Sequence, residues 1–181
     1  QVKEGDHIKV YVSNVKMADK GPKIMISRTH PNFVRKLFEN EIPEIQDGTV
    51  EIKSVSREAG SRSKVAVQCH NQDVDAVGSC IGAHGTRLGA IIDEIGGEKI
   101  DLIEYSEDPE KFIAAALAPA RVLKIEFDPE NPKTCTATVP DNQLSLSIDN
   151  RGQNVRLGAR LTGYKIDIKP DPVPYVERLE P

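Results

Sequence analysis

Two short segments decide the fold: Ile81-Gly82-Ala83-His84-Gly85-Thr86 and Ile148-Asp149-Asn150-Arg151-Gly152-Gln153. Each joins an apolar segment to a segment with helical periodicity. The strand patterns that follow, Gly97–Leu102 and Gly163–Ile168, also correspond to each other. The sequence therefore predicts one unit of about 65 residues that is present twice.

The first copy is predicted to have the order α-β-β-α-α-β. Pro31-Asn32 begins a helix whose apolar residues share one face, and Pro43 ends it. The remaining elements are strands 50–55 and 64–68 around a polar loop 56–63, helices 74–81 and 86–95, and a strand 99–105.

The second copy repeats this order. Asp108 is the expected N-cap of a helix with Pro109 at its first position, and Pro119 ends that helix. The remaining elements are strands 122–127 and 134–139, helices 141–148 and 153–161, and a strand 165–168.

The segments outside the two copies are short. Strands 7–12 and 24–27, around a turn at 20–23, suit the last strands of an oligonucleotide-binding (OB) barrel. The proline-rich stretch after residue 168 pairs poorly as a strand, so we expect a linker. The predicted domains are 1–29 (last barrel strands), 30–106, 107–170 and a tail 171–181.

Charge is unevenly distributed along the 181 residues, whose net charge is −4. Residues 16–36 hold six basic side chains and one acid, whereas 93–110 is rich in acids. Solvated surface is the simplest interpretation of both runs. The overall acidity argues against a protein that coats nucleic acid through bulk charge, but the segregated charges leave room for a local anion-binding face.

Cysteine usage and the amino end point to the cytoplasm. Three cysteines without C-x-x-C spacing favour a reducing compartment, and adjacent Cys69 and His70 would point to opposite faces of a strand rather than share a zinc ion. No signal-peptide or membrane-spanning pattern is present in the sequence. We expect a cytoplasmic monomer without metal or other cofactor.

Gly82-Ala83-His84-Gly85 is a G-x-x-G loop between two predicted helices. Glycine lets a phosphodiester backbone approach closely, and the following helix offers free amides and a positive dipole end. KH domains bind single-stranded nucleic acid with this device. Together with the order of elements and the repeat, it predicts an α+β protein with two tandem type II KH domains.

Several strings of the chain closely resemble bacterial transcription elongation factors of the NusA family. They are Lys9–Val12, Ser27–Pro31, Pro43–Ile45, Arg57–Val67, Gly96–Asp101 and Gly152–Leu157. The resemblance implies an OB barrel followed by two KH domains that bind nascent single-stranded RNA during pausing, termination and antitermination. It also implies RNA polymerase, antitermination factors and ribosomal proteins as partners.

The candidate RNA-binding residues lie in and just after the two loops. They are Ile81, Gly82, Ala83, His84, Gly85, Thr86, Arg87, Asn150, Arg151, Gly152, Gln153, Asn154 and Arg156. Arg160 and the hairpin arginines Arg57 and Arg62 are further candidates for phosphate contacts.

The two loops depart from the family pattern in different ways. Ala83 and His84 stand where the family has proline and a basic residue, so charge at the first loop depends on pH. Asp149 replaces the first glycine of the second loop, and an acid beside a phosphate path is repulsive. We therefore expect the first loop to dominate RNA binding.

Three alternatives stay open at this point. A nucleotide-binding enzyme is disfavoured by the glycine spacing and by the helix that precedes the loop. A protein-interaction scaffold with KH folds is favoured by the acidic run and Asp149. A ribosomal KH protein is disfavoured by the overall acidity and by the order of barrel and KH domains.

Overall fold

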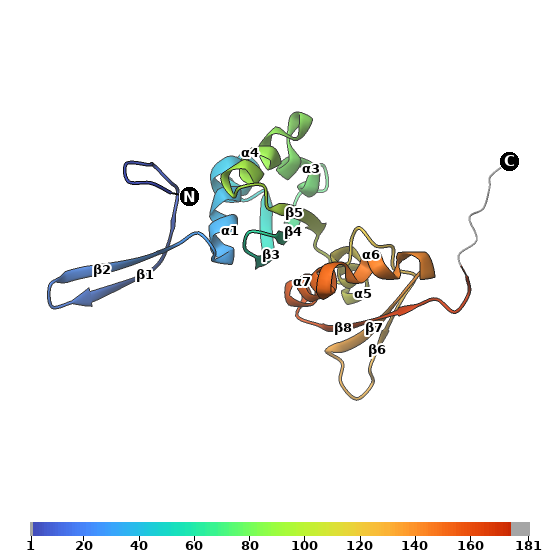
Figure 1. The fold of residues 1–181 in the computed structure, drawn as a ribbon. Coiled ribbons are helices and arrows are strands. Elements are labelled where there is room, and N and C mark those ends of the chain that lie inside the picture. The colour runs from blue at the N-terminus through green and yellow to red at the C-terminus, as the bar shows by residue number, and fades with distance from the viewer. Residues whose placement is uncertain (1, 175–181) are drawn as a thin grey trace.

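The computed structural model describes residues 2–174, and Figure 1 shows a hairpin followed by two helix-and-sheet domains. The hairpin consists of β1 (Tyr11–Ala18) and β2 (Gly21–Ser27). The elements of the first domain are α1 (Pro31–Glu41), α2 (Pro43–Gln46), β3 (Val50–Glu58), β4 (Arg62–Cys69), α3 (Ala76–Ile81), α4 (Thr86–Glu94) and β5 (Lys99–Glu104). Those of the second are α5 (Pro109–Ala116), β6 (Lys124–Phe127), β7 (Thr134–Val139), α6 (Leu144–Ile148), α7 (Gln153–Thr162) and β8 (Lys165–Pro170).

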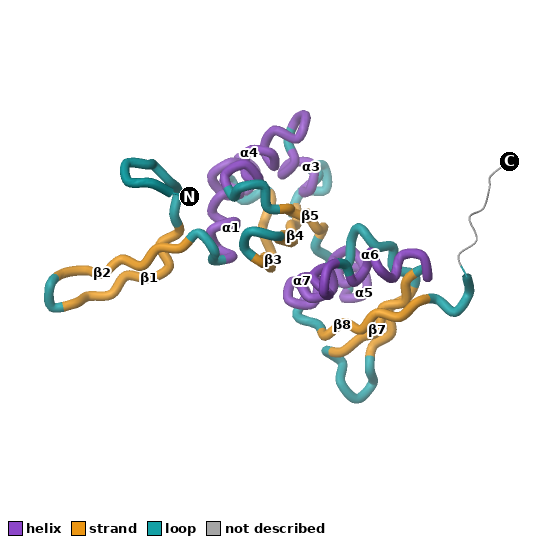
Figure 2. Tube along the Cα trace, in the orientation of Figure 1, coloured by secondary structure: helices purple, strands orange, loops and turns teal. Residues whose placement is uncertain are grey.

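Both domains have the same sheet topology, which confirms the α+β class and the duplicated unit. The strand orders are β3-β4-β5 and β6-β7-β8. In each sheet the first two strands form an antiparallel hairpin, and the third lies parallel to the second. A parallel neighbour requires a crossover connection, and a helix pair with its glycine loop provides it in each domain. Figure 2 shows α5, α6 and α7 on one side of the second sheet.

Two predicted helix starts, those of α1 and α5, are confirmed by their caps. The side chain of Asp108 accepts a hydrogen bond from the amide of Glu110 (3.1 Å), and Pro109 is the first residue of α5. At α1 the cap is His30, whose Nδ1 accepts from the amide of Asn32 (3.0 Å). Capping satisfies amides that have no partner inside the helix, so both helices begin where the sequence predicted.

The predicted polar loop 56–63 is instead mostly strand. β3 continues to Glu58 and β4 begins at Arg62, which leaves a turn of residues 59–61. The polar residues of these strand ends find partners in other parts of the fold: Ser56 donates to the carbonyl of Leu157, and Ser63 donates to Glu98. Polar composition therefore gave the wrong prediction here, because distant acceptors make these strand positions favourable.

The β1–β2 hairpin is longer than the sequence predicted. It extends from Tyr11 to Ser27 with a turn at 19–20, and residues 7–10 lie before the first strand. It projects away from both domains (Figure 1), and several of its large apolar side chains are exposed. These are Val12, Val15, Met17, Ile24, Met25 and Ile26.

The expected linker begins later than predicted. Lys169 and Pro170 still pair with Thr138 and Val139, and the amide of Asp171 donates to the carbonyl of Val139 (2.7 Å). Proline is tolerated because β8 is an edge strand, and Pro170 ends it. The last part of the predicted tail, 175–181, lies outside the described residues. Between residues 2 and 174, no helix is long and apolar enough to span a bilayer.

The two domains share part of their apolar core. One buried cluster joins Ala66 and Ile103 of the first domain to Phe112, Ala116 and Leu161 of the second. α7 also packs against β3 and β4. Because interface groups are buried as in a domain interior, the two domains form one packed body that fixes the positions of both glycine loops.

Candidate nucleic-acid interface

The first glycine loop connects α3 to α4 through a sharp backbone turn. Gly82 has φ 76° and ψ 173°, and His84 (φ 55°) and Gly85 (φ 71°) are left-handed. Glycine adopts such angles at little cost, which explains the two glycines of the motif. The turn is followed directly by α4, and the amides of Gly85 and Thr86 donate to the carbonyls of Gly82 (3.1 Å) and Ala83 within the loop.

The second loop follows the same backbone course although it has one glycine fewer. Asp149 has φ 61° and ψ −167°, Arg151 has φ 51° and Gly152 has φ 77°. These residues therefore correspond in order to Gly82, His84 and Gly85. The sequence repeat is a repeat of loop geometry as well.

The loop residues predicted to meet RNA are accessible. Ile81 is 38% exposed, and Ala83, His84 and Thr86 are exposed as well. In the second loop Asn150 and Arg151 are exposed, whereas Gly82, Gly85 and Gly152 are partly buried. Each loop thus offers a short surface of backbone and small or basic side chains between two helices.

Arg87 is held against its own domain. Its Nη1 donates to the carboxylate of Glu44 (2.6 Å) and to the carbonyl of Ser79 (2.8 Å). The aliphatic stem runs beneath Gly82, where a β-carbon would lie 2.6 Å from the Cγ of Arg87. This packing supports the first loop and explains the need for glycine at position 82.

Gln153 and Arg156 bind the first domain across the interface. Gln153 Nε2 donates to Glu58 (2.8 Å) and to the hydroxyl of Ser61 (2.7 Å), and Arg156 Nε donates to Glu58 (2.6 Å). Desolvation raises the pKa of Glu58, but these hydrogen bonds outweigh it, so the pKa lies below its ordinary value. Both side chains are engaged between domains in this structure.

The predicted RNA contact by Asn154 is wrong. Its side chain is fully buried, and its Nδ2 donates to the carbonyls of Leu117 (3.0 Å) and Ser147 (2.9 Å). It ties α7 to the end of α5 and to α6. Proximity to the loop in sequence was misleading, because this position faces inward on α7.

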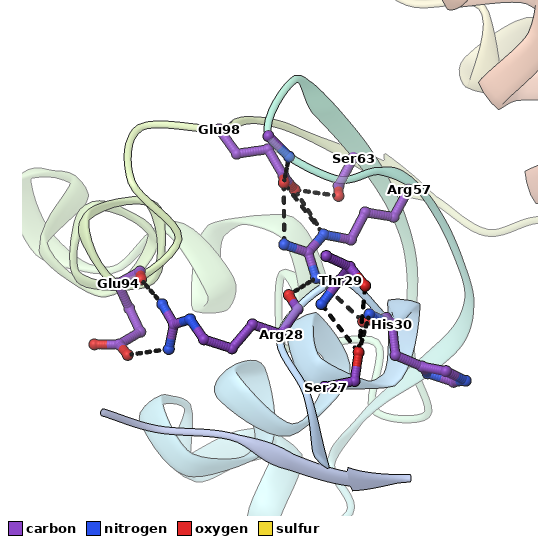
Figure 3. Close-up of polar contacts among 9 residues, drawn as sticks. Ser27, Arg28, Thr29, His30, Arg57, Ser63, Glu94 and Glu98 are labelled. Atoms are coloured by element: carbon purple, nitrogen blue, oxygen red, sulfur yellow. Dashed lines mark hydrogen bonds and ion pairs between the residues drawn. The ribbon is translucent and has the colours of Figure 1, made fainter. Parts of the chain in front are cut away.

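The hairpin arginine Arg57 is also buried, and Figure 3 shows its polar contacts. Its guanidinium pairs with Glu98 (3.1 Å), whose side chain is fully buried, and donates to the carbonyl of Arg28 (2.7 Å). In the same view Arg28 pairs with Glu94. These bonds anchor the segment after β2 to the first domain, so the predicted phosphate contact by Arg57 is wrong.

Arg62 lies at the domain interface with a side chain that is 2% exposed. Its Nε and Nη2 donate to Asp101, and its Nη1 donates to Asp149 of the second loop (2.9 Å). The fully buried Lys64 also pairs with Asp101 (2.9 Å). Desolvation lowers the pKa of Lys64, and the bond to Asp101 opposes this change.

The expectation of a solvated acidic run is wrong for three of its members. Glu98 and Asp101 pair with arginines of the first domain, and Glu94 pairs with Arg28 in the segment before it. Asp149, expected to repel phosphate as a free acid, is paired as well. The sequence carries no local signal for these pairs, because the partners are separated by 39 to 87 residues.

The cysteines do not provide a reactive thiol near the first loop. Cys80 directly precedes Ile81, but its side chain is buried. Burial raises the pKa of its thiol to about 12, and the nearby Glu44 adds to the effect. A thiol with such a pKa stays protonated and unreactive at neutral pH.

Comparison with known proteins gives two adjoining family matches. A model of the NusA-like first KH domain matches residues 28–105, and a model of the NusA-like second KH domain matches residues 109–172. The crystal structure of APE1850 covers 77% of this chain and 97% of its own chain, with a TM-score of 0.56. At 18% identity this likeness shows the fold alone.

Several curated relatives carry the name transcription termination/antitermination protein NusA. That of Bacillus subtilis is 56% identical over 92% of this chain and 45% of its own length. That of Halalkalibacterium halodurans is 54% identical over 92% of this chain and 44% of its own, and the Mycobacterium tuberculosis protein is 49% identical over 94% and 49%. The chain spans less than half the length of these relatives. Together with the two domain matches, this identity shows that the chain belongs to the NusA family and carries its first and second KH domains in tandem.

Proposed function

We propose that this chain is the RNA-binding region of a transcription elongation factor. It contacts nascent single-stranded RNA and thereby modulates pausing, termination and antitermination by RNA polymerase. The observation that carries the proposal is the pair of exposed glycine loops with one backbone course, each at the start of a helix of nine or ten residues. KH domains hold about four nucleotides with such a loop.

The finer parts of the proposal follow from the family. The protein acts without catalysis, in the cytoplasm and as a monomer, with antitermination factors and ribosomal proteins as further partners. The domain boundaries are those expected above: 1–29, 30–106, 107–170 and 171–181. Contact with RNA polymerase is proposed to depend mainly on regions of the family that this chain does not contain.

The β1–β2 hairpin is proposed to be the last part of an OB barrel. Its support is the set of exposed apolar residues on the hairpin, such as Val15 and Ile24, which suit packing against further strands. A two-stranded hairpin is marginally stable alone, and closure into a barrel would cover its edges.

The first loop is proposed to bind RNA more strongly than the second. Thr86, at the start of α4, is exposed, whereas Gln153, at the start of α7, bonds to the hairpin of the first domain. Asp149 adds a negative charge to the second loop, although Arg62 offsets it. The helix start after the first loop is therefore more accessible to RNA than the one after the second loop.

A pure protein-interaction scaffold loses part of its support. Its argument rested on the acidic run and on Asp149, but Glu98, Asp101 and Asp149 are paired with arginines within the fold. A scaffold predicts no salt-dependent RNA binding, so the same titration that tests RNA binding also tests this alternative.

The experiment compares Gly85→Asp with Gly85→Asn by fluorescence anisotropy on single-stranded RNA. Nothing lies within 4 Å of a β-carbon at Gly85, whereas a β-carbon at Gly82 meets Arg87. Asp and Asn tolerate the left-handed conformation similarly, so the pair differs in charge alone. We expect wild-type affinity to fall as salt rises and the Asp variant to bind about 5-fold more weakly than the Asn variant, or about 1 kcal/mol.

The difference between the two variants should shrink at high salt because the charge is exposed to solvent. Circular dichroism should show the same helicity for both variants. Equal RNA affinities of the two variants at low salt, or a wild-type isotherm that does not respond to salt, would contradict the proposed site.

A further inference from the structure

Four charged side chains meet between the first domain and the second loop. Arg62 bonds to Asp101 and Asp149, while Lys64 bonds to Asp101 and to the carbonyl of Ala118 (3.0 Å). The group contains two cations and two carboxylates, so its charges balance. Removal of either carboxylate would leave an excess positive charge in a region largely closed to water.

Exposure to solvent increases within this group from the two cations to Asp101 and then to Asp149. The side chains of Lys64 and Arg62 are 0% and 2% exposed, that of Asp101 is 14% exposed, and that of Asp149 is 38% exposed. Asp149 is thus the member that solvent reaches most easily. An anion arriving from solvent would meet Arg62 Nη1 at the place that the Asp149 carboxylate now occupies.

The backbone at Asp149 is that of a glycine position. Asp149 (φ 61°, ψ −167°) matches Gly82 (φ 76°, ψ 173°), and both residues begin their loops. Five residues after Gly82 stands Arg87, whose stem would clash with a β-carbon; five residues after Asp149 stands the shorter Asn154. The second loop therefore has room for a side chain at a strained position, and this side chain bonds to Arg62.

These observations concern a loop that is proposed to carry RNA phosphates. We propose that Asp149 is an internal counter-anion that takes the place of an RNA phosphate at Arg62. Guanidinium groups bind carboxylate and phosphate oxygens in the same way, so one anion substitutes for the other. Asp149 neutralises the charge of Arg62 at the second loop, so an RNA phosphate gains little binding energy there. This inference rests on the proposed function.

The first test uses inorganic phosphate and needs no RNA. Asp149→Gly removes the carboxylate and its β-carbon, which leaves Arg62 Nη1 without this acceptor and with open space beside it. Asp149→Ser also removes the charge but keeps a small side chain, while Asp149→Asn removes the charge and fills the space. Urea unfolding of the full chain is followed while phosphate replaces chloride at constant ionic strength.

Phosphate stabilises many proteins by exclusion from their surface, so wild type gives the baseline. We expect a larger phosphate-dependent rise in the urea midpoint for the Gly and Ser variants than for wild type, because a ligand that binds only the folded state stabilises it. Asp149→Asn should stay near the baseline. If the urea midpoint of Asp149→Asn rises as much as those of the Gly and Ser variants, phosphate acts through a general charge effect. If the Gly and Ser variants show no larger rise than wild type, Arg62 offers no phosphate site. Either result overturns the inference.

The second test titrates single-stranded RNA at several salt concentrations. We expect Asp149→Gly to bind several-fold more tightly than wild type at low salt, with a steeper slope of log K against log salt by about 0.7, which corresponds to one added phosphate contact. Unchanged slope and affinity would overturn the inference. If neither wild type nor any variant binds RNA, but phosphate still stabilises the Gly and Ser variants more than wild type, the proposed function is rejected. The role of Asp149 as a counter-anion at Arg62 then remains.

Discussion

Asn154 lies beside the second loop in sequence and inside the second domain in space. Its Nδ2 bonds to the carbonyls of Leu117 and Ser147, which would lose a buried donor in Asn154→Ala. We expect this variant to lose about 2 kcal/mol of unfolding free energy. Asn150→Ala, at an exposed loop position, should stay within about 0.5 kcal/mol of wild type. Urea denaturation of both variants measures the difference, and equal stabilities would contradict the structural role of Asn154.

Glu58 makes the interface sensitive to acid. Its folded-state pKa is lowered, so its stabilisation is fully present above the ordinary value of 4.5 and is lost as pH falls through the lowered value. Glu58→Gln should therefore lower the unfolding free energy by about 1 kcal/mol at pH 7, and the difference in unfolding free energy from wild type should be smaller at about pH 3.5. Urea midpoints at the two pH values measure this gap. Glu130→Gln, in the exposed turn after β6, serves as control, and a gap that widens in acid would refute the assignment.

At the scale of elements, two helical glycines differ in their surroundings. A β-carbon at Gly89 of α4 would meet nothing within 4 Å, whereas one at Gly158 of α7 would lie 3.1 Å from the carbonyl oxygen of Ala116 in α5. Alanine stabilises an open helix position by roughly 0.5–1 kcal/mol relative to glycine. Gly89→Ala should thus raise the thermal midpoint, while Gly158→Ala should not, because α5 and α7 must separate. A rise of equal size in both variants would mean that the helices are not closely packed.

Most elements could be predicted because their signals are local. Proline and an N-cap mark the start of α5, and apolar periodicity marks α1. The ends of β3 and β4 could not be predicted, since Ser56 and Ser63 are favourable there only through Leu157 and Glu98, which lie far along the chain. Polar residues in a strand look like a loop until their acceptors are known.

At the scale of the whole molecule, the domain interface should make unfolding cooperative. Ser56 donates to the carbonyl of Leu157 and Ser54 to that of Leu161, and a common apolar cluster lies between the domains. We expect one calorimetric transition whose van't Hoff and calorimetric enthalpies agree. Two separate transitions in wild type would show that the interface contributes little.

The candidate site was predictable where it depends on the loops and unpredictable where it depends on the interface. Gly82 and Gly85 are recognisable from spacing and context, and their backbone angles explain why glycine stands there. The roles of Arg62 and Asp149 follow from a pairing across 87 residues, which no periodicity reveals. Charge composition alone suggested free acids where the folded chain has ion pairs.

The asymmetry between the two loops is tested most directly by placing the same charge at equivalent positions. Gly85→Asp and Gly152→Asp both introduce an acid at a left-handed residue without a close steric contact. Single-stranded RNA is titrated by fluorescence anisotropy at low salt with wild type and each variant. Our account predicts that Gly85→Asp weakens binding about 5-fold or more and that Gly152→Asp weakens it markedly less; an equal or larger loss in Gly152→Asp would contradict it.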